Sequence, residues 1–284
     1  MLSKLRYCFF LLILFFNCSN DDGPDPITGA GIFQTTSGSA TIEGELFLPD
    51  GPGPFPSMII IPGSGNEPRQ ELESFASVLN QNGYALYIYD KRGVGNSTGA
   101  YLAEDLQDYE PFLEARADDI LGIMELLREH DQIDNSRIGI YGSSQGAWVN
   151  SEVFDADQRL SYIVMVSGGV ASVGLEQYYC QLTDDPNLSI DEAIAELANY
   201  SGPIGYDPLP IINRMDLPVL WIYGNEDRSH PARYDLAVLQ EQNRSNFTIQ
   251  LYTNTDHELI DLSSGQAPAA LFSNLGQWLT ENNN

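Results

Sequence analysis

Short, continuously apolar segments alternate with amphipathic segments along most of this chain, and this alternation constrains its fold more than any other feature. Runs such as Met58-Ile59-Ile60-Ile61 and Ile163-Val164-Met165-Val166 contain no polar residue. Such runs are typical of strands that helices cover on both faces. The candidate strands are residues 41–48, 57–61, 84–89, 137–141, 162–167, 218–223 and 247–252.

Between these runs, apolar residues recur at helical spacing in three places. They are Leu72, Phe75, Ala76 and Leu79, with Gly83 as a stop; Ile120, Leu121, Met124 and Leu127; and Leu271, Leu275, Trp278 and Leu279. Strands that alternate with helices are joined by right-handed crossovers and form a mainly parallel sheet. We therefore predict an α/β protein with a mainly parallel central sheet flanked by helices.

Residues 171–215 interrupt the alternation, because they contain no good candidate strand. Some forty residues between two core strands exceed an ordinary crossover. Ser189 precedes Asp191 and Glu192, a pattern that indicates a helix start. We interpret the segment as a helical lid inserted into a core of residues 32–170 and 216–284. A longer crossover with an extra surface helix is the alternative.

The first residues have the pattern of an export signal. Lys4 and Arg6 precede an apolar run over residues 7–16, which fits a signal peptide and is too short to span a bilayer. We predict a signal peptide over residues 1–17. Cys18 follows directly, which predicts its acylation as in bacterial lipoproteins, with simple cleavage as the alternative. Residues 18–31 are rich in Asp, Gly and Pro and predict an acidic tether.

These features predict an exported protein that is lipid-anchored to the cell envelope or surface, or otherwise secreted or periplasmic. Its contact with the membrane would then be made only through a lipid on Cys18. The formal charge is −27. Such a surface repels nucleic acid and anionic lipid headgroups, so a nucleic-acid partner is excluded. We attribute the charge to solubility or salt tolerance rather than to an electropositive partner.

A Gly-x-Ser-x-Gly pattern at Gly142-Ser143-Ser144-Gln145-Gly146 is the strongest chemical signal. It follows a candidate strand and precedes the helix-like segment 147–150, which is the strand–turn–helix setting of a nucleophile elbow. The glycines leave room for neighbouring backbone in a tight turn. Ser144 would then project at the carboxyl edge of the sheet, beside a helix amino terminus. Ser143 does not fit the spacing, and a purely structural turn is the alternative.

A serine hydroxyl needs a base to become a good nucleophile, and the chain has only three histidines. We expect His130 to be a solvated residue at the end of a helix. In hydrolases with the chain order Ser…Asp/Glu…His, the base follows the last strand of the sheet. His257 follows the last candidate strand and so holds this place. His230, just after the preceding strand, is the competitor.

The acid should follow the strand over residues 218–223, and Asp227 occupies that turn. It would hold the imidazole tautomer and stabilise the imidazolium. Glu226 is the alternative. Asp256 adjoins His257, but neighbouring residues on a loop usually point apart.

An oxyanion needs backbone N–H donors, and two segments could supply them. Gln145, directly after the nucleophile, supplies one N–H. We assign the second to Ser64 in the glycine-rich segment after the strand over residues 57–61, with Gly63 or Gly65 as alternatives. No Lys-Ser/Thr follows this segment, so it does not fit a phosphate loop.

Taken in order, four segments resemble a bacterial α/β-hydrolase esterase family that is related to the catalytic domains of prolyl-oligopeptidase-like enzymes. They are residues 61–65, 89–97, 142–146 and 220–227, and the likeness extends over about residues 40–280. The resemblance implies the α/β-hydrolase fold, a helical cap, carboxylic-ester hydrolysis and a structural turn over residues 90–97. Two features depart from it. Pro62 stands where many relatives have His, and 284 residues leave no room for the β-propeller of the related peptidases.

We therefore expect a serine hydrolase that cleaves a small-molecule ester through an acyl-enzyme, with Ser144, His257 and Asp227 as its triad and with neither metal nor organic cofactor. One rival is an exopeptidase or amidase with the same triad. It would need carboxylates in the lid that bind an amine, for which Asp184, Asp185 and Glu192 are available. The other rival is a catalytically inactive surface binding protein on this scaffold.

Two features of the lid leave alternatives open. Cys180 lacks a helpful His/Asn pattern, so we expect a packed cysteine rather than a nucleophile. A set of apolar lid residues could line the acyl or alcohol pocket, or could equally form the core of the lid itself. These are Leu175, Tyr178, Tyr179, Ile194 and Leu197.

Overall fold

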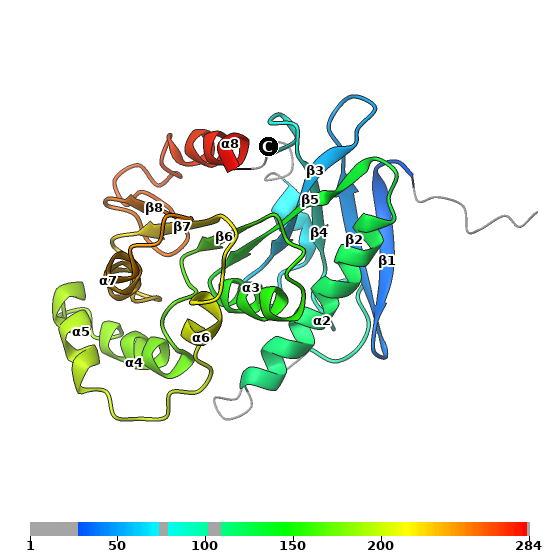
Figure 1. Cartoon of the computed structure of the whole chain (residues 1–284). Helices are drawn as coiled ribbons and strands as arrows, with labels where there is room; N and C mark the ends of the chain where they lie inside the picture. The colour runs from blue at the N-terminus through cyan, green and yellow to red at the C-terminus, as the bar shows by residue number, and fades with distance from the viewer. Residues whose placement is uncertain (1–27, 74–78, 102–108, 283–284) are drawn as a thin grey trace, which may run out of the picture.

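An eight-stranded sheet forms the centre of the protein in a computed structural model, which describes residues 28–73, 79–101 and 109–282 (Figure 1). The spatial order is β1-β2-β4-β3-β5-β6-β7-β8. β2 pairs antiparallel with β1 and β4, and all neighbours from β4 to β8 are parallel, as predicted. The strands are β1 (Gly31–Ser37), β2 (Ala40–Phe47), β3 (Phe55–Ile61), β4 (Ala85–Tyr89), β5 (Ile133–Ser143), β6 (Tyr162–Val166), β7 (Val219–Gly224) and β8 (Phe247–Tyr252).

β1 is a strand that the sequence analysis did not predict. It forms a hairpin with β2 across Gly38 and Ser39, and Gly38 has a φ of +57°. Along β1, half-buried and exposed side chains alternate, because the strand lies at the edge of the sheet. The polar Gln34, Thr35 and Thr36 weaken the apolar signal by which the other strands were found.

Helices cover both faces of the sheet (Figure 1). Ile59 and Ile61 belong to one buried cluster with α2, α3 and α7, whereas Met58 and Ile60 belong to a second cluster with α8. Burial on both faces therefore explains why the central strands are continuously apolar. The helices are α2 (Tyr109–Arg128), α3 (Gln145–Ala156), α4 (Val173–Thr183), α5 (Ile190–Glu196), α6 (Leu209–Ile212), α7 (Ala232–Gln242) and α8 (Leu271–Asn282), with 3-10 helices η1 (Arg69–Leu72) and η2 (Leu197–Asn199).

Some predicted segments lie wholly or partly outside the described residues. Residues 1–27 hold the predicted signal peptide, Cys18 and most of the tether, and residues 74–78 hold part of the helix predicted from Leu72 to Leu79. Gly83, its predicted stop, has a φ of +80°. In the described ranges, no helix combines the length and the apolar character needed to cross a bilayer.

Residues 171–215, all of which the structure describes, contain α4, α5, η2 and α6 and no strand; we call them the helical insertion. α5 begins at a capping box in which the Ser189 hydroxyl accepts from Glu192 N–H and the Glu192 carboxylate accepts from Ser189 N–H. The insertion has an apolar cluster of its own. It contains Tyr179, Ala193 and Leu197, with Leu175, Tyr178 and Ile194 packed against it.

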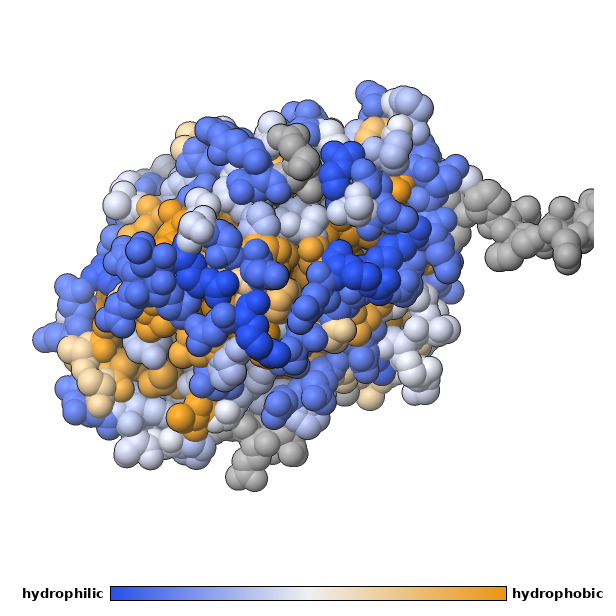
Figure 2. All heavy atoms as spheres, in the orientation of Figure 1, coloured by the Kyte–Doolittle hydropathy of each residue, from blue (hydrophilic) through white to orange (hydrophobic). Residues whose placement is uncertain are grey.

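The five apolar residues whose role the sequence left open therefore form the core of the insertion. None of them lines the cavity beside Ser144. On the surface, hydrophilic residues cover most of the face seen in Figure 2, with hydrophobic side chains in patches between them. Such a surface is expected of a chain with 40 acidic and 13 basic side chains.

Gly139 in the middle of β5 leaves room for an aromatic side chain of β6 to lie across β5. A Cβ at this position would lie 2.2 Å from the ring of Tyr162 on β6. The Tyr162 hydroxyl donates to Ser57 O on β3 at 2.9 Å, so its side chain passes over β5 from one neighbouring strand to the other.

We expect Gly139→Ala to lower the free energy of unfolding by about 1–3 kcal/mol, because the added methyl overpacks the core against this ring. Tyr162→Phe, which removes only the hydroxyl, should cost about 1 kcal/mol. Denaturant unfolding followed by circular dichroism measures both. A Gly139→Ala protein as stable as the wild type would contradict the packing described.

Candidate active site

Ser144 occupies a tight, left-handed turn between β5 and α3. Its φ is 52° and its ψ is −123°, a conformation that costs free energy for a residue with a side chain. The turn is crowded, as predicted: a Cβ on Gly142 would lie 2.2 Å from Gly146 O, and one on Gly146 would lie 2.3 Å from Ile61 O. Only glycine fits these two positions, which explains their spacing around Ser144.

The structure joins Asp227 and His257, which are 30 residues apart in the chain. Asp227 follows β7 and His257 follows β8, and these adjacent parallel strands end at the same edge of the sheet. His257 Nδ1 lies 2.8 Å from Asp227 Oδ2. The other carboxylate oxygen accepts from Ser229 N–H at 2.8 Å and from His230 N–H at 2.7 Å. Asp227 is thus fixed by its own turn. Within the described residues, no hydrogen bond occupies the second nitrogen of the His257 ring, Nε2.

Ser144 and His257 line one cavity of about 230 Å³. Tyr141, Ser143, Val166, Ser167, Glu258 and Leu259 complete its lining. No hydrogen bond joins the Ser144 hydroxyl to His257 in this structure, although both residues lie in its described part. Catalytic hydrogen bonds are often long or poorly aligned before substrate binds.

The surroundings of His257 set both its place and its proton affinity. The Ser167 hydroxyl donates to His257 O at 2.7 Å and holds the loop against β6. Burial by itself lowers the pKa of the His257 imidazole, but the hydrogen bond and negative charge of Asp227 outweigh burial. The pKa of His257 is therefore raised above its ordinary value of 6.5.

His230, the competing base, has another role. It is fully buried, with Nε2 2.6 Å from Asp235 Oδ2 on α7 and Nδ1 against Glu176 on α4. Burial alone lowers the pKa of His230, but the two carboxylates outweigh it and raise that pKa well above 6.5. Both ring nitrogens are engaged, so His230 connects the helical insertion to the core.

The prediction for His130 was wrong. Instead of a solvated residue, His130 is buried, with Nε2 3.0 Å from Gly29 O and Nδ1 accepting from Gln132 N–H at 3.2 Å. The ring also meets Phe33 of β1 edge to face. Because β1 was not predicted, the sequence offered nothing to cover this side chain.

The alternative acids are engaged elsewhere. The Glu226 carboxylate pairs with Arg233 at 3.3 Å. Asp256, although next to His257 in sequence, accepts from Ile260 N–H at 2.8 Å and stabilises its own loop. Of the three carboxylates considered, Asp227 alone has a hydrogen bond to His257.

The segments expected to supply the oxyanion donors lie beside Ser144. Gln145 is the first residue of α3, where backbone N–H groups have no partner within the helix. Gly63 packs directly on the turn that carries Ser144, since a Cβ there would lie 3.2 Å from Ser144 Cβ. Ser64 is the next residue and is exposed. Its N–H as the second donor stays a prediction.

The turn over residues 90–97 is held together by its own polar groups and by Arg69 of η1. The Asp90 side chain, 1 % exposed, accepts from Arg69 N–H and Asn96 N–H, and Asp90 O accepts from the Ser97 hydroxyl at 2.6 Å. The same turn carries Lys91, whose ammonium donates to Gly63 O at 2.9 Å. This contact, which the sequence analysis did not predict, joins the turn to the segment beside Ser144.

Cys180 has the properties of a packed thiol. Its Sγ lies 2.9 Å from Ser229 O, and burial raises the pKa of the Cys180 thiol to about 12. A thiol with such a pKa is not a nucleophile at neutral pH. Across residues 28–73, 79–101 and 109–282, no group of three or more His, Cys, Asp or Glu side chains could hold a metal ion.

The mainly parallel sheet with flanking helices and a serine in a strained strand-to-helix turn defines an α/β-hydrolase fold. The sequence model of the prolyl oligopeptidase family matches residues 70–283, and the chain belongs to this family of serine hydrolases.

Curated relatives include enzymes of two kinds. Esterase EstD of Thermotoga maritima is 23 % identical over 259 residues, covering 80 % of this chain and 60 % of its own. Acyl-coenzyme A thioesterase 3 of Mus musculus is 24 % identical over 246 residues, covering 81 % and 53 %. The chain thus spans little more than half the length of these relatives. A solved esterase of Pyrococcus furiosus superposes with a TM-score of 0.67 at 17 % identity, covering 90 % of this chain and 92 % of that one.

We expect the pKa of His257, measured by NMR titration of its ring nitrogens, to lie above 6.5 and to fall in Asp227→Asn. The amide removes the negative charge that stabilises the imidazolium, while burial remains. Asp256→Asn is the matched control, because that carboxylate bonds Ile260 N–H rather than the imidazole. Equal shifts in the two variants would contradict the pairing described.

Proposed function

We propose that the protein is a carboxylic-ester hydrolase in which Ser144 is the nucleophile, His257 the general base and Asp227 the residue that orients the base. One observation carries the proposal. His257 is held by Asp227 at 2.8 Å on the same 230 Å³ cavity that Ser144 lines. The strained backbone of Ser144 supports it as well, since such strain is concentrated at functional sites.

The mechanism follows from the groups present. His257 Nε2 takes the Ser144 proton as Oγ attacks the ester carbonyl, and Asp227 stabilises the imidazolium that forms. The N–H groups of Gln145 and Ser64 stabilise the negative oxygen of the tetrahedral intermediate. His257 then returns the proton to the leaving alcohol. Water attacks the acyl-enzyme with His257 again as base and releases the acid.

The charge of the protein favours neutral esters over acyl-coenzyme A thioesters. A net charge of −27 repels a polyanionic leaving group, and Glu258 adds a carboxylate to the cavity lining. The cavity volume, about 230 Å³, is below the usual range for sites that enclose drug-sized ligands. The charge therefore favours an uncharged substrate, and the cavity volume favours a compact one with a short acyl group.

Amide or peptide hydrolysis is the second candidate, and the structure offers it less support. Two of the three carboxylates considered for binding an amine have local partners. Asp185 accepts from Asn187 N–H at 2.9 Å, and Glu192 completes the capping box of α5. Neither these residues nor Asp184 lines the cavity.

We expect Ser144→Ala to reduce the hydrolysis of p-nitrophenyl acetate and butyrate by roughly 10³-fold or more, because the acyl-enzyme cannot form. Ser161→Ala is the matched control, since Ser161 precedes β6 at the opposite edge of the sheet. A fluorophosphonate probe should label the wild type and this control but not Ser144→Ala. Full activity in Ser144→Ala would refute the proposal, and absence of both activity and labelling in the wild type would favour a binding protein.

We also propose that the protein is exported and acylated on Cys18. The sequence supports this, because Cys18 directly follows the apolar run of a signal peptide. When the full chain is expressed in a bacterium, the wild type should partition into the detergent phase of Triton X-114, and Cys18→Ser should move to the aqueous phase. Identical partitioning of the two proteins would show that Cys18 carries no anchor.

A further inference from the structure

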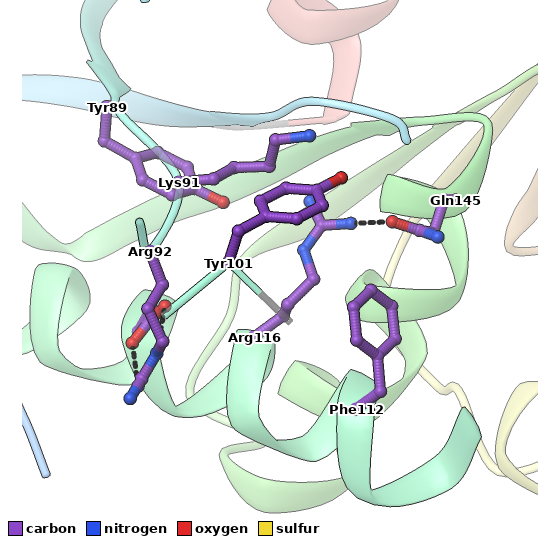
Figure 3. A pocket seen from close by; sticks show the side chains of 8 residues that line it. Tyr89, Lys91, Arg92, Tyr101, Phe112, Arg116 and Gln145 are labelled. Carbon is purple, nitrogen blue, oxygen red and sulfur yellow. Dashed lines mark hydrogen bonds and ion pairs between the residues drawn. The ribbon is translucent and has the colours of Figure 1, made fainter. Parts of the chain in front are cut away.

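Two buried basic side chains lie behind the segments that border Ser144. Arg116 on α2 is 6 % exposed and Lys91 is 5 % exposed, in a chain with only 13 basic residues. Arg116 donates through one guanidinium nitrogen to Gln145 Oε1 and through the other to Pro62 O at 2.7 Å. Figure 3 shows the guanidinium of Arg116 directed at Gln145. The rings of Tyr101 and Phe112 line the same cavity, and Arg116 Cζ lies 6.0 Å from the centroid of the Phe112 ring.

The cavity between these side chains is too small for a substrate. Its volume is about 20 Å³, which is room for about one water molecule. The two cations are instead directed at carbonyl and amide oxygens of the protein itself. Arg116 and Lys91 therefore hold parts of the protein in place and do not bind a ligand in this cavity.

The bonds to Pro62 O and Gly63 O orient two peptide groups. In a trans peptide the C=O and the following N–H point in opposite directions. Arg116 holds Pro62 O, so the Gly63 N–H points away from Arg116; Lys91 holds Gly63 O, so the Ser64 N–H points away from Lys91. Gly63 in turn packs against Ser144.

Arg116 also fixes the second segment. Besides its bond to Arg116, the Gln145 amide donates through Nε2 to the Tyr109 hydroxyl at 2.7 Å, so its side chain is held at both ends on α2. The planar fork of one guanidinium thereby joins the end of β3 to the start of α3. These are the two segments to which we assign the oxyanion donors.

We propose that Arg116 is a positioning residue for the oxyanion site: without touching the substrate, it sets the distance between the Gln145 N–H and the segment over residues 62–64, in which Lys91 orients the Ser64 N–H. The proposal rests on the esterase function proposed above. A cation on Pro62 O also polarises that peptide group and strengthens its N–H, which is that of Gly63, the alternative donor.

Simple stabilisation explains this arrangement less well. No carboxylate lies within ion-pair distance of Arg116 in the described part of the chain, and its Nε has no partner there. Asp119 lines the same small cavity and acts on Arg116 at longer range, but its carboxylate pairs with Arg92. A buried cation without an ion pair of its own is costly, and apolar side chains fill such places at lower free energy. A matched arginine is available for comparison. Arg128 on the same helix pairs with Glu125 and Asp157, and these residues are remote from Ser144 in the fold.

The test compares Arg116→Met, Arg116→Lys and the control Arg128→Met on p-nitrophenyl butyrate. We expect Arg116→Met to lower kcat by about 10-fold or more with KM nearly unchanged, because an interaction of the transition state is weakened. Its inhibition constant for a trifluoromethyl ketone, which forms a tetrahedral oxyanion on the serine, should rise by a similar factor. Arg116→Lys keeps the charge but loses the fork and should fall between the wild type and Arg116→Met. Arg128→Met should match the wild type.

The outcomes separate the two proposals. If the wild type hydrolyses esters and Arg116→Met or Arg116→Lys keeps both its kcat and its affinity for the ketone, the positioning role is wrong and the esterase function stands. If Arg116→Met does not fold, Arg116→Lys decides in the same way, together with Gln145→Met, which removes the Oε1 acceptor but keeps the N–H. If the wild type hydrolyses no ester and Ser144 is not labelled, both proposals fail.

Discussion

The close approach of three backbone segments around Ser144 is the constraint on which the site depends. Ser144 takes a left-handed conformation because α3 must begin immediately where β5 ends. Such a turn is possible only if the neighbouring chains approach without side chains, which Gly63, Gly142 and Gly146 allow. Gly168 completes the enclosure, since a Cβ there would lie 2.7 Å from Ser144 O.

The loop that carries Asp227 depends on a second set of contacts, made by the helical insertion. Tyr179 on α4 donates to Asp227 O at 2.8 Å, and the Thr183 hydroxyl donates to Arg228 O at 2.6 Å. His230 adds a charged link from Glu176 to Asp235. Asp235 in turn accepts from Val170 N–H and Ala171 N–H, where the insertion begins. The insertion thus packs on the loop that holds Asp227.

The parts of this architecture that depend on a pattern of neighbouring residues could be predicted from sequence. Continuous apolar runs predict the buried strands, and the spacing of the glycines predicts the turn at Ser144. Asp227 and His257 followed from chain order, because parallel strands bring their carboxyl ends to one edge.

Other features depend on no pattern of neighbouring residues. β1 is half polar because it is an edge strand, so the apolar pattern did not predict it. Without β1, the burial of His130 against Phe33 could not be predicted either. Arg116 is 54 positions from Pro62 and 29 from Gln145, so their hydrogen bonds are not local in sequence. An arginine on a helix has the same sequence spacing whether its side chain is solvated or buried. The partners of His230 are likewise set by how α4 packs on α7, which no spacing in the chain encodes.

The anchoring of α4 on the Asp227 loop has a consequence for how enzymes of this architecture diverge. A chimaera that received its insertion from another family member would exchange Tyr179, Thr183 and Glu176 together with whatever substrate contacts the insertion makes. Those contacts and the support of the Asp227 loop would then change in a single step. Recombination at this boundary is therefore constrained by electrostatics as well as by shape.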